Sequence, residues 1–133
     1  VLAAQAMGAD LAYIGTPFIA TEEANAVNGY KQMIAQSSAD DIVYSSLFTG
    51  VHGNYLKPSI ANAGMDPDNL PKSDPSAMDF SDKRNRPKSW KDIWGAGQGI
   101  GAIKELVSTQ KLVDQLHQEY NRALETLWAK VNG

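Results

Sequence analysis

The sequence predicts an α/β fold, and two observations near its amino end carry that prediction. The apolar run Leu11 to Ile14 is typical of a strand buried on both faces in a parallel sheet. A helical pattern from Val1 to Met7, with Gly8 as its stop, precedes this run, and a turn followed by a helix start comes after it. Helix, strand and helix in this order form the repeating unit of α/β proteins.

The turn after the predicted strand is Gly15-Thr16-Pro17. Glycine permits a tight turn and a close approach to the backbone, and Pro17 has no N–H for a strand ladder, so the strand should end here. Thr21 is expected to cap the next helix, whose first turn would hold two glutamates. A strand, a Gly-Thr turn and a helix start together favour a phosphate site, and a plain strand-to-helix turn is the alternative.

The middle of the chain predicts three further elements. The helix should run from Thr21 to about Gln36, with Val27, Tyr30 and Ile34 on one stripe. Asp41 to Leu47 is rich in β-forming residues and predicts a short strand. A short helix should begin at Lys57-Pro58 and stop at Gly64.

Met65 to Ser89 holds four prolines and few periodic apolar residues, which predicts a long irregular excursion. Beyond it, Trp90 and Trp94 are expected to anchor the carboxyl segment. The last helix should be capped by Ser108 or Thr109 and run to about Val131. Its apolar stripe, at spacings of three and four, consists of Val113, Leu116, Tyr120, Leu124, Leu127 and Val131. All of these except Val131 should be buried, with the Thr21–Gln36 helix as a candidate partner.

Composition excludes several classes of function. Twelve Lys and Arg against 15 Asp and Glu give a net charge of -3, which argues against a nucleic-acid or anionic-membrane surface. The chain has no cysteine, so a disulfide framework, a thiol nucleophile and a thiolate metal site are excluded. The loop acids do not converge in the way a metal site needs, and no apolar run approaches the ~20 residues that span a bilayer. A cytoplasmic location is the default expectation.

Several segments in order resemble the nitronate monooxygenases, formerly called 2-nitropropane dioxygenases. The first is Gly15-Thr16 followed by Phe18-Ile19-Ala20-Thr21-Glu22-Glu23-Ala24, which is similar to the last barrel strand and helix start of that family. The resemblance continues through Asp41-Ile42-Val43-Tyr44, Phe48-Thr49-Gly50 and Trp90-Lys91-Asp92-Ile93-Trp94-Gly95-Ala96-Gly97-Gln98-Gly99. One position departs from it, because Pro17 stands where the family commonly has arginine.

The resemblance implies the carboxyl-terminal portion of an FMN-dependent (β/α)8 TIM barrel, comprising its last strand and the helices that follow. It implies that Tyr13, Ile14, Gly15 and Thr16 belong to the segment that contacts the FMN phosphate. Gln98 would lie near the isoalloxazine ring or the substrate, in a segment that folds over the flavin; a solvated glutamine in a glycine-rich helix entry is the alternative.

A complete barrel of this kind needs roughly 250 residues. We therefore expect residues 1–133 to be an incomplete barrel that requires the remainder and is inactive alone. The family's catalytic histidine would lie upstream of Val1, and no catalytic role is transferred to His52 or His117. The spacing of Gly97, Gly99 and Ala102 also matches a dinucleotide fingerprint, although Lys91 to Trp94 is a poor buried strand to precede it.

The activity implied by the resemblance is the oxidation of an alkyl nitronate by dioxygen to a carbonyl compound and nitrite. Two alternatives stay open. One is a barrel similar to the FMN-dependent enoyl-acyl carrier protein reductases, which share the Gly-Thr pair. The other is a non-enzymatic binding or structural domain.

Overall fold

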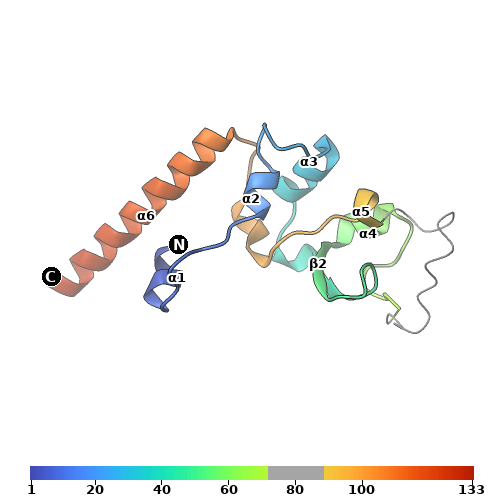
Figure 1. The fold of residues 1–133 in the computed structure, drawn as a ribbon, viewed down its shortest axis with the longest axis horizontal. Helices are drawn as coiled ribbons and strands as arrows, with labels where there is room; N and C mark the ends of the chain where they lie inside the picture. Colours follow the sequence, from blue (N-terminus) through green and yellow to red (C-terminus); the bar gives the residue numbers. More distant parts are fainter. Residues whose placement is uncertain (72–88) are drawn as a thin grey trace.

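A computed structural model of the chain describes residues 1–71 and 89–133, and it is an α/β arrangement with one small sheet (Figure 1). The predicted excursion falls outside the described residues between 72 and 88. In chain order the elements are α1 (Leu2–Ala6), α2 (Thr16–Ile19), α3 (Asn28–Gln36), the 3₁₀ helix η1 (Ala39–Asp41), β1 (Ile42–Ser45), β2 (Gly53–Leu56), α4 (Lys57–Asn62), α5 (Ser89–Asp92), the 3₁₀ helix η3 (Gln98–Ala102) and α6 (Thr109–Asn132).

The sheet is an antiparallel hairpin in which Ile42 of β1 faces Leu56 of β2 and Ser45 faces Gly53. The strand predicted at Asp41–Leu47 is confirmed as β1. Its partner β2 was not predicted. The helix predicted to follow is confirmed as α4, and Gly64 beyond its end has a φ of 84°, a left-handed conformation that favours glycine.

Residues 94–96 extend this sheet along β2. The N–H of Leu56 donates to the carbonyl of Trp94 at 2.8 Å, and the N–H of Ala96 donates to the carbonyl of Asn54 at 3.3 Å. The approach is close: a Cβ on Gly95 would lie 3.1 Å from the Asn54 carbonyl oxygen. The glycine at this position therefore lets the carboxyl part of the chain join the hairpin.

The core lies where α3, the hairpin and η3 meet, and its members come from distant parts of the sequence. Ile34, Leu56 and Ile100 are completely buried at its centre. Ala20 and Ala96 complete the cluster, and the aromatic rings of Tyr30 and Trp94 cover it. Because Ile19 and Ala20 pack in or against this cluster together with Ala96 and Ile100, the cluster holds the end of α2 and residues 96–100 in place.

The expected buried strand at Leu11 to Ile14 is wrong. These residues make no strand ladder, and Leu11 and Tyr13 are 89% and 102% exposed. A strand of a parallel sheet needs a parallel neighbour, and the described residues offer none to this segment. Among the described residues the run has no parallel strand beside it, and its apolar surface is left open.

The helix expected from Thr21 to Gln36 is only half correct. One short helix, α2, already begins at Thr16, and the second, α3, begins at Asn28. Thr21 caps neither of them; its hydroxyl donates to the carbonyl of Phe18 at 2.8 Å, and its backbone forms a parallel bridge with Val107. Tyr30 and Ile34 face the core as predicted, but Val27 is 60% exposed.

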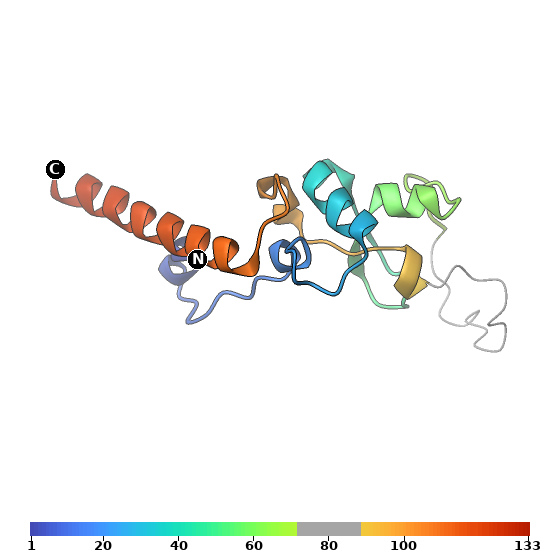
Figure 2. The same cartoon turned by 90° about the horizontal axis from the view of Figure 1, so that it is seen from above.

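The long carboxyl-terminal helix is confirmed as α6, and Ser108 caps it by accepting the N–H of Lys111 at 3.2 Å. Its packing was predicted wrongly. In α6 only Leu112 is buried; Leu116 and Tyr120 are half-buried, and Leu124 and Leu127 are 46% and 49% exposed. Figures 1 and 2 both show α6 at one end of the molecule beside α1, away from α4 and α5. Among the described residues, no helix is both long and apolar enough to cross a bilayer.

Glu23 fastens the start of α6 to the segment that follows α2. Its carboxylate accepts the N–H of Thr109 at 2.8 and 3.0 Å and the Thr109 hydroxyl at 3.0 Å. The N–H of Glu22 donates to the carbonyl of Val107 at 3.0 Å beside it. The N–H of Thr109 is the main reason that the pKa of Glu23 is lowered.

A lowered pKa makes this contact sensitive to acid. A carboxyl with a lower pKa in the folded protein stabilises the fold above its unfolded pKa, and that contribution is lost as pH falls through the folded pKa. We expect Glu23→Gln to reduce the decline in unfolding free energy between about pH 6 and about pH 3, measured by urea denaturation. Glu119→Gln, on an exposed part of α6, is the control. Equal pH profiles for the two variants would contradict the assignment.

Candidate functional site

The Gly15-Thr16 turn leads directly into α2, with Gly15 as the N-cap residue and Thr16 as the first helical residue. Pro17, predicted to end a strand, instead lies in the first turn of α2, at a position where a helix needs no N–H. In the described part of the chain, no hydrogen bond uses the N–H of Gly15 or of Thr16. A Cβ on Gly15 would meet only the Tyr13 ring, at 4.0 Å, so the turn presents two backbone donors beside open space.

The glycine-rich segment around Gln98 lies between two buried residues, Ala96 and Ile100. Both belong to the core cluster, whereas Gln98 and Gly99 between them are exposed. A Cβ placed on Gly99 or Gly101 would meet no atom within 4 Å. The segment is therefore held at both ends and open in its middle.

The structure brings these two segments together although they are 81 residues apart in the sequence. The N–H of Gly97 donates to the hydroxyl oxygen of Thr16 at 2.9 Å. A hydroxyl group can accept and donate at once, so the proton of Thr16 remains available for another acceptor. The site thus combines two backbone donors, one hydroxyl donor and the exposed amide of Gln98.

These groups fit the phosphate of FMN, which is the cofactor implied by the resemblance. Phosphate oxygens accept hydrogen bonds from backbone N–H groups and hydroxyls, and Gly15 allows them to come close. The donors at the turn are backbone N–H groups and a hydroxyl, all of them neutral. Pro17 adds neither an N–H nor a charged group to them. The single turn of α2 also replaces the longer helix expected after Thr21, so Glu22 and Glu23 do not lie in the first turn of a helix at the site.

The other two residues of the predicted phosphate segment precede the turn. Tyr13 is fully exposed, and Ile14 is half-buried. Neither makes a hydrogen bond among those found in the described residues, so both remain predicted cofactor contacts through backbone or packing.

Tyr30 and Trp94 pack against each other and fix the start of the glycine-rich segment. Their rings stack with centroids 5.1 Å apart, and the Tyr30 hydroxyl donates to the carbonyl of Gly95. Burial raises the pKa of this hydroxyl, which keeps its proton in place for that bond. The expected anchoring role of Trp94 is confirmed. Tyr30 was identified only as a core residue, because its bond to Gly95 crosses 65 positions of sequence.

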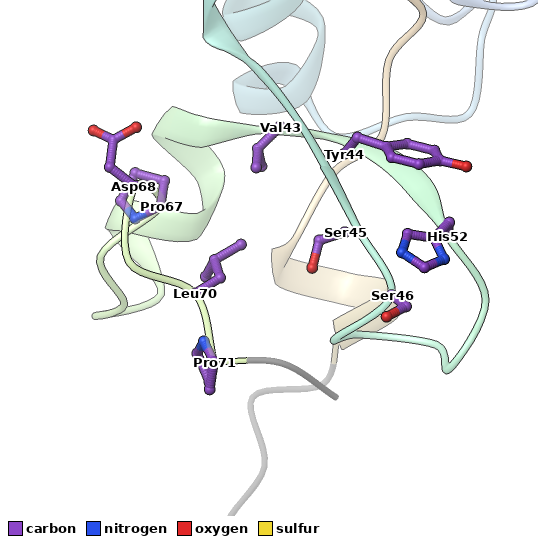
Figure 3. Close-up of a pocket in the computed structure, with 9 residues that line it drawn as sticks. All are labelled: Val43, Tyr44, Ser45, Ser46, His52, Pro67, Asp68, Leu70 and Pro71. Atoms are coloured by element: carbon purple, nitrogen blue, oxygen red, sulfur yellow. The ribbon is translucent and has the colours of Figure 1, made fainter. Parts of the chain in front are cut away.

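A separate hollow of about 500 Å³ lies beside the hairpin and contains His52 (Figure 3). Val43, Ser45 and Leu70 point into it, while the Asp68 carboxylate points away and pairs with Lys57 at 2.9 Å. His52 stacks on Tyr44, with ring centroids 4.9 Å apart, and is exposed. None of the residues at the Gly15–Thr16 turn lines this hollow.

The glycine spacing at Gly97, Gly99 and Ala102 does not form a dinucleotide-binding unit. That unit requires a buried strand followed by a glycine turn and an α-helix. Here residues 94–96 lie along the hairpin edge, and the glycines enter the five-residue 3₁₀ helix η3, which ends at Ala102. The spacing is thus a coincidence of sequence.

Comparison of the sequence with known proteins identifies the family to which it is similar. The profile of the nitronate monooxygenase family matches residues 1–119. A nitronate monooxygenase of Paraburkholderia phytofirmans is 28% identical over an alignment of 133 positions, which covers 96% of this chain and 36% of that protein.

Two solved structures share the fold. FabK of Thermotoga maritima superimposes with a TM-score of 0.66 at 18% identity, over 96% of this chain and 42% of that chain. A single-residue mutant of the same FabK gives a TM-score of 0.65 at 18% identity, over 40% of that chain. The chain thus spans about two-fifths or less of the length of the proteins that it resembles.

Proposed function

Since the chain belongs to the nitronate monooxygenase family, we propose that it forms part of an FMN-dependent oxidoreductase that oxidises alkyl nitronates with dioxygen. In this proposal the chain contributes the carboxyl-terminal portion of a (β/α)8 barrel, in which Leu11 to Ile14 would form a strand only beside a parallel neighbour that the described residues lack. The rest of that barrel, together with the catalytic histidine, comes from sequence that precedes Val1. We refer to the whole as the full-length barrel.

One observation carries the proposal: the hydrogen bond between Gly97 and Thr16 joins the Gly-Thr turn to the Ala-Gly-Gln segment. These are the two segments that a flavin site of this family needs on one side of the barrel. In many (β/α)8 enzymes the phosphate site is formed after strands seven and eight, where the turn would lie. The contact supports the proposal because a single flavin would need both segments at one location.

Each residue has a defined task in this mechanism. Gly15 and Thr16 bind the phosphate and thereby fix the position of the cofactor, while Gln98 offers its amide at the edge of the ring. When bound, FMN supplies the redox chemistry, taking electrons from the substrate and passing them to dioxygen. Nothing in the described residues takes the role of the general base, so proton removal falls to the expected histidine upstream.

The proposal is tested on the full-length barrel. We expect the purified protein to contain stoichiometric FMN and to release nitrite from an alkyl nitronate under air. An enoyl thioester with a reduced nicotinamide should give no turnover; rapid reduction of it, with no nitrite from nitronates, would favour the enoyl reductase alternative. A protein that retains no flavin would overturn the proposal.

The isolated 133-residue chain should bind FMN only weakly. It offers one turn and one segment with neutral donors, whereas tight binding needs contacts that converge from several loops. Equilibrium dialysis should therefore detect no stoichiometric complex at micromolar FMN. A purified yellow complex of this chain alone, in a ratio of one to one, would contradict the prediction.

In the full-length barrel, Gln98→Ala should change kcat or the flavin absorbance spectrum more than it changes stability. The side chain is exposed, so its removal leaves no cavity. Steady-state kinetics, the visible spectrum and thermal unfolding would be compared with those of Gln110→Ala, an exposed glutamine of α6. A large loss of stability with normal kinetics would make Gln98 a structural residue instead.

A further inference from the structure

We infer that Thr16 is a positioning residue that couples occupancy of the phosphate turn to the placement of the Gly97–Gln98 segment. The inference rests on the proposed function and goes beyond it. The proposal above requires only that both segments touch the same flavin. The coupling makes one threonine hydroxyl the link between them.

The geometry of the link is specific. Thr16 lies 81 residues from Gly97 in the sequence, and the hydroxyl oxygen accepts the Gly97 N–H at 2.9 Å. A Cβ on Gly97 would lie 3.5 Å from this same oxygen, so the Thr16 side chain packs closely against the Gly97 backbone. Among the hydrogen bonds of the described residues, this is the one that joins the Gly15–Thr16 turn to residues 97–99.

The residues on either side of the Gly97–Gln98 segment are fixed in the core. Ala96 and Ile100 hold the two ends in the core, so only the residues between them can shift. Gln98 and Gly99 are exposed and form the start of η3, for which Gly97 is the N-cap residue. The bond from the Gly97 N–H to Thr16 therefore fixes the residue from which the turn that carries Gln98 begins.

Chemistry makes the link respond to a phosphate. When the Thr16 hydroxyl donates its proton to a phosphate oxygen, the hydroxyl oxygen becomes a better acceptor, because hydrogen bonds in a chain polarise one another. The bond from Gly97 then strengthens, and the segment that carries Gln98 is held more tightly over the ring. By linkage, a well-placed segment strengthens phosphate binding to the same extent.

Hydrogen exchange at the Gly97 amide tests the coupling directly. Glycine labelled with ¹⁵N is incorporated into the full-length barrel and into the variants Thr16→Ser and Thr16→Val, and exchange is followed by NMR. FMN is the probe, and riboflavin, which has the same ring without the phosphate, is the control ligand. Thr16→Ala serves as a second variant without a hydroxyl in case the valine variant fails to fold.

We expect FMN, but not riboflavin, to slow Gly97 exchange about tenfold in the unaltered protein and in Thr16→Ser. In Thr16→Val and Thr16→Ala, Gly97 should exchange rapidly whether or not saturating FMN is present. FMN binding with an unresponsive Gly97, or equal effects of FMN and riboflavin, would overturn the coupling and leave the proposed function intact. Failure of the unaltered protein to bind FMN would overturn both.

Discussion

Leu56→Ala should lower the free energy of unfolding by about 2–5 kcal/mol, the range for a large apolar side chain removed from a closed core. Leu56 is completely buried and ends β2 where α4 begins. Its N–H donates to Trp94, and its carbonyl accepts the Ser59 hydroxyl at 2.7 Å. The backbone around it is therefore fixed on both sides, which prevents the structure from collapsing into the cavity.

The matched control is Leu124→Ala, which removes the same atoms from a side chain that is 46% exposed on α6. Urea denaturation of both variants gives the comparison, and the control should lose no more than about 1 kcal/mol. Similar losses for the two variants would mean that the hairpin and α4 do not enclose a core of the kind described.

Thr16→Val should weaken FMN retention by the full-length barrel about 10- to 100-fold. Loss of a hydrogen bond to a charged phosphate costs roughly 1.5–3 kcal/mol. The backbone donors of Gly15 and Thr16 remain, so binding should be reduced rather than abolished. Isothermal titration of the apoprotein with FMN measures the change.

Thr16→Ser is the control for this prediction, because it keeps the hydroxyl and changes only a methyl group. Its FMN affinity should stay within about threefold of that of the unaltered protein. That change in binding free energy is well below the value of a hydrogen bond to a charged phosphate. If the valine and serine variants bind FMN equally well, Thr16 is a turn residue with no part in binding the cofactor.

Local patterns in the sequence predicted the helices α4 and α6 correctly. The bounds of α6 and α4 follow from periodicity, capping and glycine stops, which depend on neighbouring residues only. The segment Leu11 to Ile14 has the composition of a strand, yet a strand exists only when paired. Conversely, β2 contains Gly53 and Asn54, which strands disfavour, and it forms because β1 lies beside it.

The site shows the same division between local and distant information. The family was predicted from ordered motifs, and the profile match confirms it. Gly15, Thr16 and Gln98 were predicted as contacts of one cofactor, but the bond from Gly97 to Thr16 had no signal in the spacing of either motif. The exposed stripe of α6 was misjudged for a similar reason, because periodicity identifies an apolar face without identifying what covers it.

Because α6 is attached to the preceding structure at its amino-terminal end, Thr109 would be the pivot of any tilt of this helix. Glu23 binds Thr109 in the first turn of α6, and the bridge from Thr21 and Glu22 holds Val107 just before it. Near the middle of α6, the Tyr120 hydroxyl donates to Gln5 of α1. At 1.5 Å per residue the helix is about 36 Å long, so a tilt of about 10° at the pivot displaces its far end by about 6 Å. A small rearrangement next to Thr21 that tilted the helix would therefore displace Trp128 and Val131 much further than the residues at the pivot.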